Sequence, residues 1–326
     1  MIGISGIGIY EPQKKITIEE LGTHLSIEER DKIGVKSVPI ETSLTTTQMA
    51  VIASKNAIED AGIVPLDIDL IINTQASLHD YLLWQVSAAI QNELQACNAR
   101  FFDVYQGCSG FITGLITAKK FLQGDDGEET ILVNTSEKWD VSIKDKILGG
   151  LVFGEGGTAA IVQKNSKGNF ILGYGMISRG NLNDVSRMTM GAINHPSQID
   201  FDEEDYYYKV TNLEKAKKEM IPINVDLFYQ VGEQAVKNSG LTMADISHLI
   251  FPNVGFGLFE KVVDRYDMDL NQTNYRYVQE TGDCGTVDTL LSYHRMLRDE
   301  QLQKDDHVLI LAQGAGATWV AIVIKV

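Results

Sequence analysis

The sequence predicts an α/β fold made of two similar units, and an internal repeat is the main observation behind that prediction. Segment 56–75, NAIEDAGIVPLDIDLIINTQ, aligns without gaps with segment 234–253, QAVKNSGLTMADISHLIFPN, so that Gly62 falls on Gly240. Each segment has the pattern of an amphipathic helix, a glycine at its C-terminal end, a turn and an apolar run typical of a buried parallel strand. We expect an N-terminal unit over residues 1–165 and a C-terminal unit over 166–326, packed as one compact body.

The remaining elements repeat in the same order. Segment 105–122, YQGCSGFITGLITAKKFL, resembles segment 280–297, ETGDCGTVDTLLSYHRML, and each has a glycine turn that enters a helix. Segment 156–164, GGTAAIVQK, parallels segment 316–326, GATWVAIVIKV, as a closing strand. A strand, helix, strand, helix, strand order with right-handed crossovers builds two similar α/β units that pack against each other.

The repeat also predicts where a site would lie. Ligand sites in such sheets favour the carboxyl ends of the strands, and the corresponding turns of two packed units meet there. We therefore expect the loops that carry Cys108, Asn253, Asp283 and residues 314–316 to lie near one another.

Composition and charge exclude several classes of protein. The formal net charge of −16 argues against a nucleic acid or an anionic membrane as the main partner, because phosphate contacts need clustered Lys and Arg. No apolar run approaches the roughly 20 residues that span a bilayer, and the N-terminus lacks the pattern of a signal peptide, so we expect a cytoplasmic protein. Three cysteines at wide spacing, Cys97, Cys108 and Cys284, fit neither a disulfide framework nor a metal site.

Cys108 is the candidate nucleophile, in the stretch DVYQGCSGFITG. A cysteine just before a helix would meet free backbone N–H groups and the helix dipole, which stabilise a thiolate and lower its pKa. The flanking glycines allow a sharp turn and close approach of a substrate. The alternative is a small buried side chain in the core, which is how free cysteine usually behaves, and Cys97 and Cys284 are assigned to that class.

Five motifs occur in the same order as in ketoacyl-acyl-carrier-protein synthase III, a family of the thiolase superfamily, which the chain resembles over essentially its whole length: GISGIGIYEP, AIEDAGIVPLDIDLIINTQ, GCSGF, VFGEGGTAAIV and GAGATWVAIVIKV. The resemblance implies the thiolase-like duplicated αβαβα five-layer fold. It also implies that Cys108 accepts an acyl group as a thioester from coenzyme A or an acyl carrier protein, with no further cofactor. An oxyanion hole would be formed by the Cys108 N–H and a backbone N–H of the turn at 314–316, where Ala315 replaces the middle one of three usual glycines.

The other catalytic positions depart from the family pattern. Asn253 stands where a histidine is usual, Asp283 stands where an asparagine is usual, and Thr281 replaces a second histidine. Decarboxylative condensation needs neutral donors beside the developing enolate, so a carboxylate at 283 disfavours that step. Some similar relatives with an aspartate there transfer acyl groups to hydroxyls or amines, with Asp283 as base or orienting group and Asn253 as a hydrogen-bond donor.

Two further side chains are candidates for supporting roles. His79 follows the strand LIINT, so it is a possible surrogate base; a loop histidine with no catalytic role is the alternative. Lys32 aligns with an arginine of the family and would contact a phosphate of coenzyme A as a point charge, unless it is a surface lysine.

The best hypothesis is an acyl-thioester transferase that forms an acyl-Cys108 intermediate, with condensation or transfer to oxygen or nitrogen as its second step. The alternatives are a synthase whose histidine comes from elsewhere, and a noncatalytic scaffold subunit that pairs with an active synthase-like chain. The resemblance implies a homodimer or a heterodimer with a homologous chain. An acidic carrier protein would need a local basic patch, for which Lys215, Lys217 and Lys218 are candidates. The acidic and aromatic segment from His195 to Val210 is interpreted as a lid, a partner surface or an exposed loop.

Overall fold

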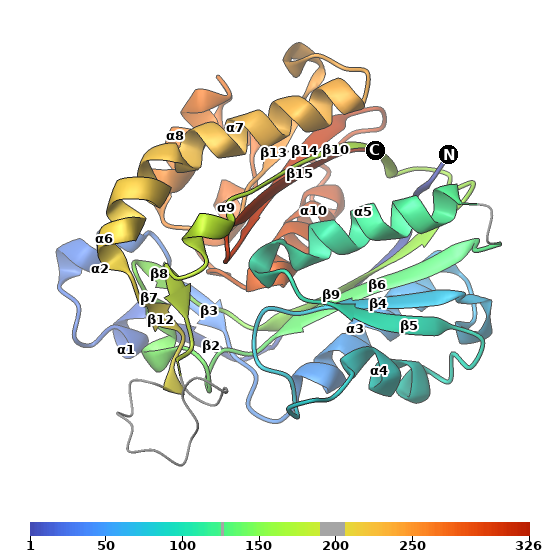
Figure 1. Cartoon of the computed structure of the whole chain (residues 1–326), viewed down its shortest axis with the longest axis horizontal. Coiled ribbons are helices and arrows are strands. Elements are labelled where there is room, and N and C mark those ends of the chain that lie inside the picture. The colour runs from blue at the N-terminus through green and yellow to red at the C-terminus, as the bar shows by residue number, and fades with distance from the viewer. Residues whose placement is uncertain (125–126, 190–205) are drawn as a thin grey trace.

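The computed structural model describes residues 1–124, 127–189 and 206–326. His195 and the part of its segment up to residue 205 lie outside the described residues. A nine-stranded mixed sheet runs through the molecule in the order β13-β14-β15-β10-β1-β9-β6-β4-β5 (Figure 1). Its strands are β1 (Gly3–Tyr10), β4 (Leu70–Thr74), β5 (Arg100–Val104), β6 (Thr130–Glu137), β9 (Gly156–Gln163), β10 (Phe170–Ser178), β13 (His248–Ile250), β14 (His307–Gly314) and β15 (Thr318–Lys325).

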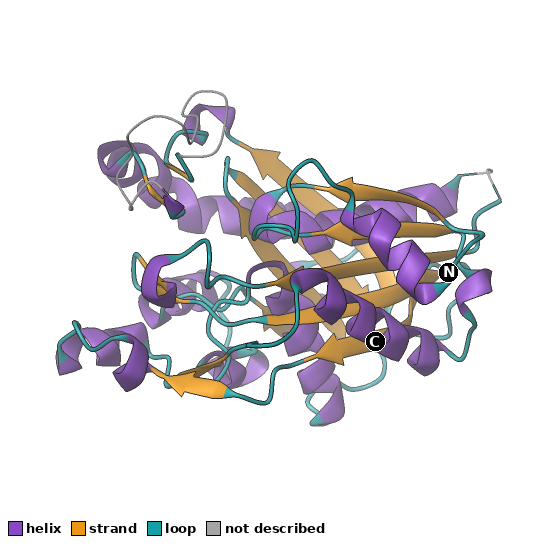
Figure 2. Cartoon of the chain, turned by 90° about the horizontal axis from the view of Figure 1, so that it is seen from below, coloured by secondary structure: helices purple, strands orange, loops and turns teal. Residues whose placement is uncertain are grey.

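Helices cover both halves of the sheet and fill the space between them. The helices are α1 (Ile18–Leu21), α2 (Ile27–Ile33), α3 (Thr46–Ala61), α4 (Val86–Leu94), α5 (Gly110–Gln123), α6 (Leu213–Lys215), α7 (Ile221–Asn238), α8 (Phe256–Arg265), α9 (Tyr275–Val278) and α10 (Asp288–Arg298). The layers follow as α7 and α8, the C-terminal strands, α5 and α10, the N-terminal strands, then α3 and α4 (Figure 1). Figure 2 shows the strands passing through the middle of the molecule with helices on either side.

The two halves have the same strand pairing, which confirms the duplicated five-layer fold. In the N-terminal half, β1 and β6 pair antiparallel with β9, and β4 lies parallel between β6 and β5. In the C-terminal half, β10 and β14 pair antiparallel with β15, and β13 lies parallel to β14. A parallel bridge between Leu249 and Thr273 stands where β5 stands in the first half. The half-sheets join where the Ile4 N–H donates to the Asn169 carbonyl at 3.0 Å and the Ile171 N–H donates to the Ile2 carbonyl at 3.1 Å.

Short strand pairs lie at the edge of the nine-stranded sheet that carries the site. They are β2 (Lys15–Thr17) with β3 (Ser37–Pro39), β7 (Ile147–Leu148) with β8 (Leu151–Val152), and β11 (Ser186–Arg187) with β12 (Lys209–Val210). None of the helices in the described ranges is long and apolar enough to cross a membrane.

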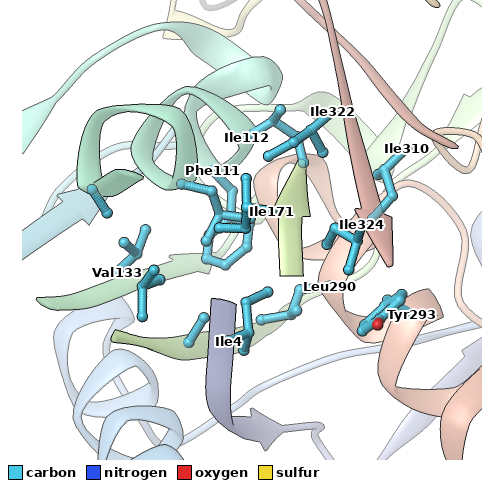
Figure 3. Packing of buried hydrophobic residues seen from close by; sticks show 14 of the residues in the cluster. Ile4, Phe111, Ile112, Val133, Ile171, Leu290, Tyr293, Ile310, Ile322 and Ile324 are labelled. Atoms are coloured by element: carbon cyan, nitrogen blue, oxygen red, sulfur yellow. The ribbon is translucent and has the colours of Figure 1, made fainter. Parts of the chain in front are cut away.

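The central helices α5 and α10 are buried because a half-sheet covers each of their faces. Figure 3 shows Phe111 and Ile112 of α5 close to Ile171 and Ile322 of the C-terminal strands, with Leu290 of α10 in the same cluster. A helix that packs on two sides needs apolar residues around most of its circumference, and the sequence GFITGLITAKKFL supplies them. This packing fixes the N-terminal ends of α5 and α10, and the site is built there.

The turns before α5 and α10 are equivalent turns of the two halves, and they are separated along the sequence by the same number of residues as Gly62 and Gly240. Gly107 has a φ of +52° and Gly285 a φ of +62°, and each begins a short 3₁₀ turn, η2 (Gly107–Ser109) and η9 (Gly285–Val287). Their separation, 285 − 107 = 178, equals 240 − 62 = 178. The sequence alignment of 105–122 with 280–297 was therefore wrong by three residues. The 3₁₀ turns that begin at Gly107 and Gly285 define the correct register, because Gly282, which the letters align with Gly107, also has a positive φ, of +60°.

Candidate active site

Cys108 lies in the turn η2, directly before α5, at the position expected for a nucleophile. The side chain is partly buried. The Ser109 hydroxyl donates to the Gln106 carbonyl at 2.8 Å, and the Thr113 hydroxyl donates to the Ser109 carbonyl at 3.1 Å. These bonds tie the turn to the first turn of the helix, so the sulfur atom is held on a rigid element.

The turn at 314–316, between β14 and β15, packs directly against the cysteine turn. A Cβ atom on Gly107 would lie 2.9 Å from the Ala315 nitrogen, and one on Gly314 would lie 2.2 Å from the Gln106 carbonyl oxygen. Only glycine permits this approach at both positions. The two backbone segments expected to form an oxyanion hole are thus adjacent, and the roles of the Cys108 and Ala315 N–H groups stay a prediction.

Asp283 is a buried carboxyl group in the loop before η9. Its backbone N–H donates to the Val152 carbonyl at 2.8 Å, and its Oδ1 atom accepts the Gly285 N–H at 2.8 Å. Burial raises the pKa of Asp283 to about 7, with a further increase from the charge of Glu137 that the Gly285 hydrogen bond partly opposes. A carboxyl group with this pKa can take up or release a proton near neutral pH.

Asn253 is buried beside a second aspartate, Asp288, at the start of α10. The Asn253 amide donates to the Gly282 carbonyl at 2.8 Å and to Asp288 Oδ1 at 3.4 Å, while its Oδ1 accepts from Asn274 at 3.2 Å. Asp288 also accepts the backbone N–H groups of Asn253 at 3.0 Å and Cys284 at 2.6 Å. In this conformation the Asn253 side chain therefore fixes the Asp288 carboxyl group, and its predicted role as a donor to substrate is untested.

Asp288 and Glu137 are two site carboxyls that the sequence analysis did not identify. Burial, and then the charge of Asp283, raises the pKa of Asp288 well above its ordinary value. Glu137, at the end of β6, accepts the backbone N–H groups of Ala76 at 2.8 Å and Ser77 at 2.7 Å, and a hydrogen bond from the Thr286 hydroxyl. Burial raises the pKa of Glu137 as well. Each carboxyl ends or begins an apolar element, and this is the one signal in the sequence that could have drawn attention to them.

The pKa of the Cys108 thiol is raised well above its ordinary value, against the sequence-based expectation. Burial is the largest cause, followed by the negative charges of Asp283, Glu137 and Asp288. The expected position before a helix is present, but the favourable dipole is outweighed by desolvation and by three carboxyls that come from other segments. The resting thiol is therefore protonated, and a base must accept its proton before the sulfur atom can attack.

The supporting candidates lie in different surroundings. Lys32 forms an ion pair with Glu28 at 2.9 Å on α2, and its side chain is 73% exposed. His79 follows β4 in a loop, and its Nδ1 atom is buried with no hydrogen-bond partner among the described residues. Their predicted roles in phosphate binding and proton transfer stay predictions.

The structure also shows the surroundings of the other two cysteines and of the clustered lysines. Cys284 is buried and Cys97 is exposed, and neither forms a disulfide. Lys215 pairs with Asp184 at 2.8 Å and Lys218 with Glu214 at 3.3 Å, so these two of the three clustered lysines are bound to carboxylates. The structurally described part of the chain contains no group of three or more His, Cys, Asp or Glu side chains that could hold a metal ion.

Comparisons with known proteins match this chain to a family and to solved structures of the same fold. The family model of 3-oxoacyl-[acyl-carrier-protein] synthase III matches residues 102–180, and the model of its C-terminal part matches residues 236–326. A beta-ketoacyl-[acyl-carrier-protein] synthase III of Caldanaerobacter subterraneus is 28% identical, over 99% of this chain and 97% of the relative.

Solved structures share the architecture. The crystal structure of 3-oxoacyl-[acyl-carrier-protein] synthase III from Aquifex aeolicus has a TM-score of 0.84 at 22% identity and covers all of both chains. The acyltransferase ChlB3 has a TM-score of 0.88 at 19% identity, over 100% of this chain and 97% of that one.

Proposed function

Because the chain belongs to the ketoacyl-[acyl-carrier-protein] synthase III family, we propose that it moves an acyl group from a thioester to the Cys108 sulfur and then to an acceptor. One observation carries the proposal. The Cys108 turn packs against the turn at 314–316, and a buried carboxyl with a pKa of about 7, Asp283, acts electrostatically on the thiol.

The first step forms the acyl enzyme. Asp283 accepts the thiol proton of Cys108 as the sulfur atom attacks the thioester carbonyl carbon. The oxyanion that results is stabilised by the N–H groups of Cys108 and Ala315. The intermediate then collapses, the bond to the donor sulfur breaks, and the donor leaves as a thiol with the proton that Asp283 returns to it.

The second step passes the acyl group to a hydroxyl or an amine. The acceptor attacks the thioester carbonyl, Asp283 takes the acceptor proton, and the bond to Cys108 breaks so that the sulfur atom recovers a proton. A base is useful here, whereas a carboxylate beside a developing enolate is unfavourable. We therefore favour transfer to oxygen or nitrogen over carbon–carbon bond formation. The same fold also serves ChlB3, an acyltransferase.

The donor is either acyl-CoA or an acyl carrier protein. Lys32 is the candidate phosphate contact, and Lys217 is the one lysine of the basic cluster for which the described residues show no carboxylate partner. A net charge of −16 opposes an acidic carrier protein. Coenzyme A is itself a polyanion, so the net charge does not choose between the two donors, and the panel of thioesters below includes both.

The proposed assembly is a dimer of two copies of this chain, joined at β5. This strand is the outer strand of the nine-stranded sheet, and its backbone can pair with a second strand. The loops after β4 and β5 expose large apolar side chains, from Tyr81, Leu82, Leu83 and Tyr105, and exposed apolar side chains of this kind favour an interface. Leu83→Asp should give a monomer by light scattering and Leu213→Asp, at an exposed site on α6, should not. A homologous partner chain that co-purifies would instead indicate a heterodimer.

The decisive test is intact-protein mass spectrometry after incubation with a panel of acyl-CoA and acyl-carrier thioesters. We expect an acyl adduct on the native protein and on Cys97→Ala, because Cys97 is exposed and lies before the N-terminal end of β5, whereas the Cys108 turn follows the C-terminal end of that strand. Cys108→Ala should give none. An adduct that persists in Cys108→Ala would contradict the assignment of the nucleophile. No adduct from any donor would favour the noncatalytic scaffold.

A further inference from the structure

A pocket of about 250 Å³ lies between the segments 143–148 and 207–209. Its walls include the apolar side chains of Ile143, Ile147 and Leu148 and the ring of Tyr208. The other lining residues are His24, Lys144, Asp145, Tyr207 and Lys209, so the apolar wall is accompanied by polar and charged groups that can bind the polar arm of a ligand. Tyr208 is the polar group of this pocket that is connected to the catalytic residues.

Tyr208 is held in place from three directions. Its hydroxyl forms a hydrogen bond with the Ser186 hydroxyl at 2.6 Å, and its backbone N–H donates to the Ser142 carbonyl at 2.7 Å. Its ring packs on the buried cluster of Trp139, Ile143 and Phe153. A side chain fixed in this way loses little freedom when it binds a ligand.

The same cluster is attached to the loop of Asp283. Phe153 and Asp283 form a parallel backbone bridge, and the Gly154 N–H donates to the Asp283 carbonyl at 3.0 Å. A Cβ atom on Gly285 would lie 2.8 Å from the Trp139 ring. Tyr208, which lines the pocket, therefore packs on the same cluster that contacts the catalytic loop.

The phenol of Tyr208 responds to the charges of the catalytic residues. Burial is the largest cause that raises its pKa to about 12, the Ser186 hydrogen bond opposes it, and the charges of Cys108, Tyr105 and Asp283 add to it. The hydroxyl is therefore protonated throughout the neutral range and is available as a hydrogen-bond donor while Ser186 donates to its oxygen.

We propose that Tyr208 is a substrate-contacting residue: its hydroxyl, supported by Ser186, donates a hydrogen bond to the thioester donor in this pocket and so positions the thioester at Cys108. The ligand class is an acyl thioester whose arm carries a hydrogen-bond acceptor such as an amide. The inference rests on the proposed function, to which it adds a residue that recognises the donor.

The test compares Tyr208→Phe with Tyr206→Phe, a matched phenol that is 43% exposed two residues earlier. The probe is octanoyl-N-acetylcysteamine, which carries one thioester and one amide. We expect the second-order rate of Cys108 acylation to fall about tenfold in Tyr208→Phe, the size of one ordinary hydrogen bond. The same acylation rate should fall by a few-fold in Ser186→Ala, and in Tyr206→Phe it should stay within about twofold of the native rate.

Two further measurements separate recognition from a merely structural effect. Alkylation of Cys108 by iodoacetamide, which does not need the pocket, should be the same in Tyr208→Phe and the native protein. An equal loss in both reactions, or unchanged acylation, would overturn the proposal. The nonreactive thioether S-octyl-N-acetylcysteamine should bind Cys108→Ala protein, and Tyr208→Phe in that background should weaken binding about tenfold by calorimetry. This binding does not depend on catalysis. If the thioether binds but no acyl adduct forms, the proposed function alone is rejected. If thioether binding does not depend on Tyr208, this inference alone is rejected.

Discussion

Replacing Asp283 with asparagine should make Cys108 more reactive toward a simple alkylating reagent. Asparagine keeps the Oδ1 atom that accepts the Gly285 N–H at 2.8 Å, so the loop should keep its conformation. The substitution removes one negative charge that raises the pKa of Cys108. For two charges about 7 Å apart at an effective dielectric constant of about 20, that interaction is about 2.4 kcal/mol, or about 1.7 pKa units.

The expected rate change is smaller than the change in thiolate population. A fall of about 1.7 units raises the thiolate fraction about fiftyfold, but a less basic thiolate is also about sixfold less nucleophilic, which leaves about an eightfold gain. Asp288 loses a like-charged neighbour in this variant and ionises more readily, which opposes the gain. We expect alkylation of Cys108 at pH 8.5 to rise about three- to eightfold by this reasoning.

The assay is site-resolved mass spectrometry of iodoacetamide adducts over time. Cys97, which is exposed, is an internal control whose rate should not change. Glu280→Gln is the matched variant, because Glu280 is a 67% exposed carboxylate three residues away. The difference should shrink at pH 6, where Asp283, with its pKa of about 7, is largely protonated in the native protein. An unchanged or slower rate at pH 8.5, or the same increase at pH 6, would refute the assignment of Asp283 as an ionised neighbour of the thiol.

Further predictions concern stability and the glycine turn. The folded-state pKa of Asp283 lies above its ordinary value of 3.8, so this group costs stability as pH rises from about 4 through 7. Asp283→Asn should therefore stabilise the fold at pH 8, by at most about 4 kcal/mol, and should not stabilise it at pH 4. Denaturant unfolding at both pH values measures this difference, and equal effects at the two pH values would argue against a raised pKa of Asp283. Gly107→Ala should cost at least about 2 kcal/mol more than Gly62→Ala in the same assay and abolish acylation. Both glycines have positive φ, but a Cβ on Gly107 would meet the Ala315 nitrogen, whereas one on Gly62 would meet nothing within 4 Å; equal costs would count against the contact.

The duplicated fold was predictable because its signals are local. Gly62 and Gly240 both end a long helix segment with positive φ, and the apolar runs that follow both become parallel strands, β4 and β13. Such signals need only a few neighbouring residues. The register of the turns before α5 and α10 was not predictable from letters, because Gly107 and Gly285 are defined by backbone conformation and by what packs on them.

The electrostatics of the site were not predictable for a different reason. The sequence placed Cys108 before a helix, which the structure confirms, and from this alone a low pKa was expected. The opposite direction arises because Glu137 at the end of β6 and Asp288 at the start of α10 come to the same point as Asp283. Their convergence depends on the packing of both halves, and no single segment contains it.

The carboxyl groups support the proposed transfer to oxygen or nitrogen over condensation. Decarboxylation would develop a negative charge in the field of Asp283 and Glu137, and an ionised carboxylate would oppose it by roughly 2 kcal/mol for two charges separated by about 7 Å. Transfer to a hydroxyl or an amine instead releases a proton, which a carboxyl with a pKa of about 7 can accept. The position usually held by histidine also differs. Asn253 stands there, and its amide donates to the Gly282 carbonyl and to Asp288. Restoring a histidine there would break both bonds and leave the carboxyl groups in place, so Asn253→His should not create condensing activity.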